Sequence, residues 1–205
     1  MDRELENSDV MTAGRARGPT PALVIFALAM LASVPAQLSH AQPANDEYKV
    51  KAAFVFHFAQ LVDWPSDAPG VPADSFNVCL LDDEPHKQEF QNILEGKLIG
   101  RRTTHIRLLN KSQSAENCRI LFLSRNEGRR QAELLRAVRG LPVLTVGDAD
   151  GFLTDGGMIR FHLDQDKIRF DISVGPAETS HLKISSRLLL LATSVLHSDG
   201  TGSGI

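Results

Sequence analysis

The chain has 205 residues, of which 42% are hydrophobic and 23% are charged, and its formal net charge is −3. This near balance of charge gives no electrostatic basis for binding nucleic acid or an anionic membrane, so we expect no nucleic-acid partner. The length suits one domain of ordinary size with its own hydrophobic core.

The first 41 residues have the pattern of an export signal. Arg15 and Arg17 precede an apolar run from Ala22 to Leu31, and Ser39-His40-Ala41 supplies small residues for a cleavage site. Because a transmembrane helix needs about 20 apolar residues, this run is short for a membrane anchor, which is the alternative interpretation. We predict a signal peptide at 1–41, cleaved after Ala41, and therefore a periplasmic protein.

Helices and short apolar strands alternate after the signal. Asn45 as N-cap and the helical spacing of Val50, Phe54, Phe58 and Leu61 predict a helix that ends near Trp64-Pro65. The further predicted elements are strands at 76–81, 103–109, 119–124 and 142–146 and helices at 83–96 and 126–139. This alternation favours an α/β domain with a mostly parallel sheet and helices on both faces.

The C-terminal part departs from that alternation. Its predicted elements are strands at 158–163 and 167–173, a helical turn after Gly175-Pro176, a helix from Ile184 to His197 and a flexible tail at 198–205. The polar turn Asp164-Gln165-Asp166 predicts that the two strands form an antiparallel hairpin extending the sheet. Ser185-Ser186 is expected to cap the helix. One domain therefore spans 42–197.

The chain has two cysteines, Cys79 and Cys118. In an oxidising compartment such a pair is most simply one disulfide, which closes a loop of roughly 40 residues and stabilises the fold by about 4 kcal/mol in the chain-entropy account. Two separate buried thiols are the alternative. A redox-active pair normally has Cys-x-x-Cys spacing, which these cysteines lack.

The sequence holds no catalytic or metal-binding pattern of recognised spacing. No His-Glu-x-x-His or Gly-x-Ser-x-Gly occurs, and the glycine-rich segment 147–157 connects two predicted strands, whereas a phosphate-binding loop opens a helix. A metal site built from distant histidines is a weaker alternative. We expect no enzymatic activity, no metal and no cofactor.

Two predicted helices are more apolar than packing on a sheet requires. Val55, Phe56 and Val62 widen the apolar face of the first helix, and Leu189, Leu190 and Leu196 widen that of the last. Each helix is therefore buried on two sides or offers a surface to another chain.

Several short motifs follow one another along the chain. They are Tyr48-Lys49-Val50-Lys51-Ala52-Ala53-Phe54, Phe58-Ala59, Trp64-Pro65, Gly96-Lys97, Cys118-Arg119-Ile120-Leu121-Phe122, Leu144-Thr145-Val146-Gly147-Asp148, Gly151-Phe152, Gly156-Gly157-Met158-Ile159, Ile168-Arg169-Phe170-Asp171-Ile172 and Leu182-Lys183-Ile184-Ser185-Ser186. In this order they resemble the YfiR family of exported bacterial proteins over nearly all of the chain after residue 41.

The resemblance implies a Rossmann-like three-layer α/β domain in the periplasm, often a homodimer and without enzymatic activity. Such a protein represses an inner-membrane diguanylate cyclase by binding its periplasmic sensor region, which lowers cyclic-di-GMP and disfavours biofilm. An OmpA-like outer-membrane lipoprotein can sequester the repressor. Cys79 and Cys118 match positions that form a disulfide in the family, while a second cysteine pair of some members is absent.

A repressor must bind one state of its partner better than the other, and wide apolar helix faces supply area for that contact. We expect Phe54, Phe58, Trp64, Leu189 and Leu190 at a partner or dimer interface. The alternative function is a periplasmic module that senses a small molecule in the crevice at the carboxyl ends of the strands. A periplasmic enzyme is the third and least favoured possibility.

Overall fold

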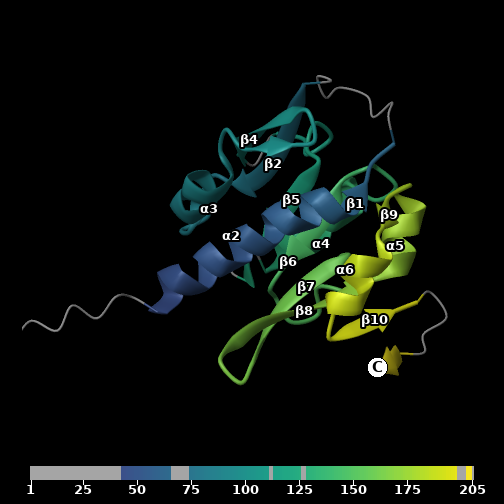
Figure 1. Ribbon diagram of the computed structural model, residues 1–205. Coiled ribbons are helices and arrows are strands. Elements are labelled where there is room, and N and C mark those ends of the chain that lie inside the picture. Colours follow the sequence, from purple (N-terminus) through teal and green to yellow (C-terminus); the bar gives the residue numbers. More distant parts are fainter. Residues whose placement is uncertain (1–42, 66–73, 111–112, 126–127, 198–201, 205) are drawn as a thin grey trace, which may run out of the picture. The chain divides into compact units, whose positions relative to one another are not determined.

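The computed structural model describes residues 43–65, 74–110, 113–125, 128–197 and 202–204 (Figure 1). The predicted signal peptide at 1–41 lies outside the described residues. The helices are α2 (Pro43–Leu61), α3 (Lys87–Leu94), α4 (Arg129–Ala137), α5 (Val174–Thr179) and α6 (Ser186–Leu191). The strands are β1 (Val62–Asp63), β2 (Ser75–Leu81), β3 (Leu98–Ile99), β4 (Arg102–Leu109), β5 (Ile120–Leu123), β6 (Leu144–Gly147), β7 (Ile159–Asp164), β8 (Lys167–Ser173), β9 (Lys183–Ile184), β10 (Ser194–Leu196) and β11 (Gly202–Gly204).

The main sheet has nine strands in the order β11-β10-β8-β7-β6-β5-β2-β4-β3. Parallel pairing joins β4 to β2, β2 to β5, β5 to β6, β6 to β7 and β8 to β10. The strands β7 and β8 pair antiparallel around Gln165 and Asp166, which both have positive φ, as a two-residue hairpin turn of type I′ requires. The predicted α/β class and the mostly parallel sheet are confirmed.

Apolar side chains fill both faces of the main sheet. One core cluster joins α2, α3, α5 and α6 to one face of the strands, with Phe58, Phe90 and Leu188 among its members. The other cluster joins Leu135 of α4 to the opposite face, which includes Leu121 and both cysteines. The strands β5 and β6 are buried throughout because each strand is covered on both sides.

The predicted C-terminal helix from Ile184 to His197 is wrong. The helix α6 spans only Ser186–Leu191, with the Ser185 hydroxyl accepting the Leu188 N–H at 3.3 Å as its cap. At Ala192 the backbone is extended, and β10 then pairs parallel with β8. The apolar spacing resembled that of a helix, but Thr193 and Val195 are β-branched and the free edge of β8 offers a pairing partner, which favours a strand.

The other differences concern the start of α3 and several short strands that the sequence did not predict. The helix α3 begins at Lys87 instead of at Asp83 to Pro85, because the buried Glu84 carboxylate turns inward and accepts the His86 N–H at 3.0 Å. The short strands β1, β3 and β9 were not predicted, since two-residue strands carry no periodicity. In the segment predicted as a flexible tail, Gly202–Gly204 form β11 and pair with β10, and the rest of that segment lies outside the described residues.

The glycine-rich segment 147–157 closes over one buried aromatic ring. Phe152 is fully buried, and a Cβ atom placed on Gly147 or Gly157 would lie 2.4 Å and 2.2 Å, respectively, from carbons of that ring. Only glycine permits so close an approach, so these two glycines serve packing and the segment is a connection that completes the core.

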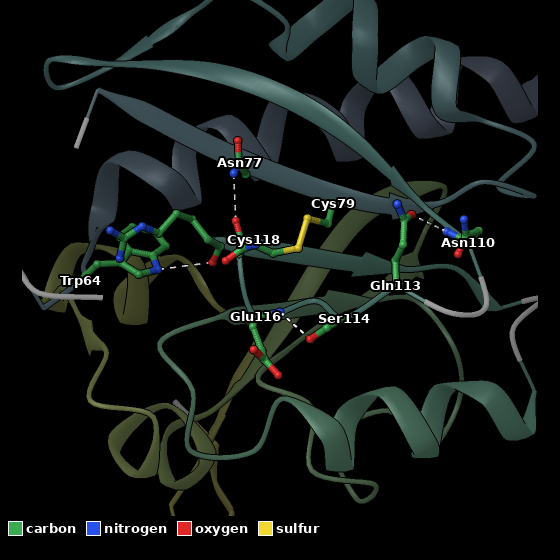
Figure 2. The surroundings of a disulfide bond; sticks show 10 residues. Trp64, Asn77, Cys79, Asn110, Gln113, Ser114, Glu116 and Cys118 are labelled. Carbon is green, nitrogen blue, oxygen red and sulfur yellow. Dashed lines mark hydrogen bonds between the residues drawn. A yellow bond between two sulfur atoms is a disulfide. The ribbon is translucent and has the colours of Figure 1, made fainter. Parts of the chain in front are cut away.

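A disulfide joins Cys79 of β2 to Cys118, which precedes β5, and both residues are buried (Figure 2). The single disulfide predicted from the sequence is confirmed. Figure 2 also shows the Asn77 side-chain amide, which donates to the Asn117 carbonyl at 2.9 Å beside the disulfide. The end of the long connection between β4 and β5 is thus tied to β2 by one covalent bond and one hydrogen bond.

Replacing both cysteines by alanine is expected to lower the free energy of unfolding by about 2–5 kcal/mol, because the unfolded chain regains the entropy of an open loop. Urea denaturation followed by circular dichroism measures the change. Dithiothreitol should destabilise the wild-type protein similarly and leave the double variant unchanged. Equal sensitivity of both proteins to dithiothreitol would contradict this account.

Candidate functional site

The helix α2 is the element on which the candidate site is built. It has 19 residues, and the face toward the sheet carries Tyr48, Ala52, Val55 and Ala59, all buried. These positions recur every three or four residues, which is the spacing that brings side chains onto one side of a helix. Lys51 lies on the same side and is only 1% exposed, so a charged amine is buried on the apolar side of the helix.

Lys51 is paired with Asp148, which follows β6. The Lys51 Nζ contacts Asp148 Oδ2, and both side chains are 1% exposed. The Tyr48 hydroxyl donates to the same carboxylate oxygen at 2.9 Å, and the Arg125 backbone N–H donates to Asp148 Oδ1 at 2.6 Å. Asp148 therefore receives three donors, as a buried carboxylate requires.

Two further charged side chains, Glu47 and Arg125, lie on the outer side of the pair formed by Lys51 and Asp148. Glu47, one helical turn before Lys51, also contacts the Lys51 Nζ. The Arg125 guanidinium lies 2.9 Å from Glu47 Oε1 and 3.5 Å from Asp148 Oδ2. The five residues Glu47, Tyr48, Lys51, Arg125 and Asp148, called the charge cluster below, thus alternate in sign and satisfy one another.

The surroundings of Tyr48 and Arg125 determine whether each of these two groups keeps its proton. Burial raises the pKa of Tyr48 well above its ordinary value, and the neighbouring Asp148 carboxylate raises it further. Burial alone would lower the pKa of Arg125, but the negative charges of Asp148 and Glu47 outweigh it and raise the pKa. Tyr48 therefore stays neutral as a hydrogen-bond donor, and Arg125 stays cationic.

The cluster lies at the carboxyl ends of neighbouring parallel strands. Asp148 follows β6 and Arg125 follows shortly after β5, while His86, beyond the end of β2, stacks on the Tyr48 ring with the ring centroids 3.7 Å apart. Ligands of open α/β sheets commonly bind in this crevice. Here side chains of the chain itself occupy the crevice, so the charge cluster acts chemically as an anchor that fixes the first half of α2 on the sheet.

The residues predicted for an interface are distributed between core and surface. Leu190 is 76% exposed, whereas Phe58 is 1% exposed and belongs to the core. Phe54 and Leu189 are half-buried and pack against the core. Trp64 is half-buried; its ring meets Phe76 edge to face, and its indole N–H donates to the Arg119 carbonyl at 3.3 Å. The set predicted from the sequence therefore does not form one surface patch.

Two exposed leucines lie next to each other on α6. Leu190 and Leu191 are 76% and 61% exposed and follow one another along the helix, beside the C-terminal half of α2 (Figure 1). Isolated exposed leucines are ordinary, but two adjacent ones on a short helix form a patch suited to contact with another molecule. We call Leu190 and Leu191 the α6 patch.

Sequence reasoning missed the charge cluster. Lys51 and Asp148 are 97 residues apart, and no local spacing reveals a contact over that distance. Two signals were available: Lys51 falls on the apolar stripe of α2, and Asp148 ends a buried strand. Both residues also lie within the motifs that carry the family resemblance.

Neither a metal site nor a membrane span is found in the described ranges. There, no three His, Cys, Asp or Glu side chains come together to hold a metal ion. No helix in the same part of the chain is long and apolar enough to cross a membrane.

Replacing Lys51 by methionine is expected to lower the free energy of unfolding by about 3–5 kcal/mol, because Asp148 loses its buried cationic partner and the cation that remains, Arg125, is half-exposed and 3.5 Å away. Lys49→Met is the matched control: Lys49 pairs with Asp46 on the solvent side of the same helix, and its loss should cost less than about 1 kcal/mol. Urea denaturation measures both variants. Equal costs would contradict an anchoring role for Lys51.

Titration of Tyr48 should be delayed in the folded protein. The chain contains one tyrosine, so its near-ultraviolet tyrosinate absorbance reports this residue alone. It should rise near pH 10 in urea and at clearly higher pH in the folded protein. Because the folded state holds the phenolic proton more tightly, the free energy of unfolding should fall as pH rises above about 10. Coincident titration curves would show that the hydroxyl is not buried against Asp148.

Comparison with known proteins gives one family match. The profile of the YfiR/HmsC-like family matches residues 48–193, a range that includes all of the main core, from Tyr48 of the charge cluster to the end of α6. A search of curated proteins finds no match. The family resemblance drawn from the motifs is confirmed, and the chain belongs to the YfiR/HmsC-like family.

Proposed function

We propose that this protein is a periplasmic repressor of an inner-membrane diguanylate cyclase, and that it acts by binding the periplasmic sensor region of the cyclase. The observation that carries this proposal is the family match over residues 48–193. The YfiR/HmsC-like family suggests a periplasmic, non-catalytic regulator of diguanylate cyclase signalling. Repression by direct binding is the further step proposed here.

The surface of the domain supports binding as the mode of action. Leu190 is the most exposed large apolar side chain within the described residues, at 76%, and Leu191 beside it is 61% exposed. Apolar anchors that lose water on binding commonly dominate the free energy of an interface. We therefore assign the partner contact to the α6 patch, with the half-buried Leu189 and Phe54 behind it.

Other features implied by the resemblance remain proposals. A homodimer would give the α6 patch a second possible contact, and an OmpA-like lipoprotein would compete for the repressor. Export with cleavage after Ala41 is required for any of these partners to meet the protein. A Rossmann-like architecture is supported by the helices on both faces of the mostly parallel sheet.

Cellular cyclic-di-GMP tests the proposal directly. Deletion of the gene should raise cyclic-di-GMP; the full-length gene should restore the low level, and a version lacking residues 1–41 should not, because the repressor would stay in the cytoplasm. Leu190→Glu should restore it only in part, since a carboxylate in the contact must be desolvated.

Leu163→Glu is the matched control. Leu163 is also an exposed leucine, at 54%, but it lies near the C-terminal end of β7 and not on α6. It should repress as well as the wild type, and both variants should keep the melting temperature of the wild type. Unchanged cyclic-di-GMP in the deletion strain would contradict the proposed function. Full repression by Leu190→Glu would show that the cyclase does not bind at Leu190.

A further inference from the structure

A pocket of about 350 Å³ lies between the C-terminal half of α2, α6 and the strand β8. This volume falls at the lower end of the range of about 300–1,000 Å³ found for sites that bind small molecules. The apolar residues lining the pocket are Phe54, Phe58, Leu61, Phe170, Leu188 and Leu191. Three phenylalanines and three leucines make a wall suited to an apolar ligand body.

The walls of the pocket are held in place by the fold. Phe58, Phe170 and Leu188 are buried in the core. The strands β1 and β9, which continue α2 and precede α6, pair with each other, and the Ser185 N–H donates to the Leu61 carbonyl at 3.0 Å. The spacing between the two helices is therefore fixed before any ligand arrives, which lowers the entropy cost of binding.

The polar residues at the pocket carry side-chain donors that have no partner in the part of the chain that the structure describes. They are His57, Gln60 and Arg187, all exposed. Arg187 forms no ion pair with another described residue, and the side chains of His57 and Gln60 form no hydrogen bond within the same ranges. No carboxylate of a described residue lines the pocket. A guanidinium beside an apolar pocket without a counter-ion is complementary to an apolar molecule with one anionic group.

We propose that this pocket binds a small amphipathic carboxylate. The apolar body lies against the phenylalanine and leucine side chains, the carboxylate pairs with Arg187, and His57 and Gln60 supply further donors. The site is distinct from the crevice at the carboxyl ends of the strands, which the charge cluster fills. It borders the proposed cyclase contact and shares Leu191 and Phe54 with it, whereas Leu190 does not line the pocket.

Octanoate is a suitable probe, with 1-octanol as its uncharged analogue. Isothermal titration of the protein purified from the full-length gene should show one octanoate site and clearly weaker binding of octanol. Arg187→Gln should raise the dissociation constant for octanoate by about tenfold or more, since a hydrogen bond between charged groups is lost. Leu191→Glu should weaken octanoate further by placing a like charge at the pocket.

Arg169→Gln is the control, because Arg169 is exposed and alternates with Phe170 along β8, so it points to the other face of the sheet. It should bind octanoate like the wild type. Absence of octanoate binding, equal binding by Arg187→Gln or equal affinity for octanol would overturn the proposal. The proposal would also be overturned if the wild-type protein were a dimer that does not bind octanoate and Leu191→Glu were a monomer that does. That result would show that a second copy of the chain covers the pocket. These measurements do not involve the cyclase, so their failure is separate from failure of the proposed function.

Discussion

The contact between Lys51 and Asp148 determines where α2 lies on the sheet. A buried ion pair contributes little net stability, because the desolvation of both charges offsets their attraction. Its effect here is geometric. A helix with only apolar side chains toward the sheet could shift by one turn of about 5.4 Å and still bury similar area. Among the described residues, Asp148 is the carboxylate beyond α2 that pairs with Lys51. A shifted helix would break this buried contact and leave Lys51 only with Glu47 of its own helix and Asp148 only with Arg125.

The position of α2 in turn sets the geometry of the pocket and of α6. Its C-terminal half lines one side of the pocket, and the chain continues into β1, which pairs with β9 directly before α6. The cluster near the start of α2 and the α6 patch beside its end are thus connected through one helix of 19 residues and one short strand pair. An exposed apolar pair such as Leu190 and Leu191 can serve as a specific contact only where the elements beneath it are held rigidly.

Short-range patterns in the sequence predicted much of the fold but did not predict the charge cluster. The buried strand β5 is a continuous apolar run, and such runs between helices are typical of a parallel sheet. The residues 184–197 show where local pattern fails: leucine spacing favoured a helix, while pairing with β8 drew Ser194–Leu196 into the sheet. Phe58 was predicted at an interface because an apolar stripe does not reveal how many layers cover it. The charge cluster depends on contacts across the whole chain, which spacing cannot encode.

The disulfide and the helix α6 belong to different layers of the molecule. Cys79 and Cys118 pack in the core on the α4 side of the sheet, whereas α2 and Leu188 pack on the other side. Substitutions at the exposed positions of α6 are therefore expected to leave the disulfide and its contribution to stability intact. Such a division lets descendants of one ancestral domain acquire new binding specificities while the scaffold tolerates the destabilisation that accompanies most mutations.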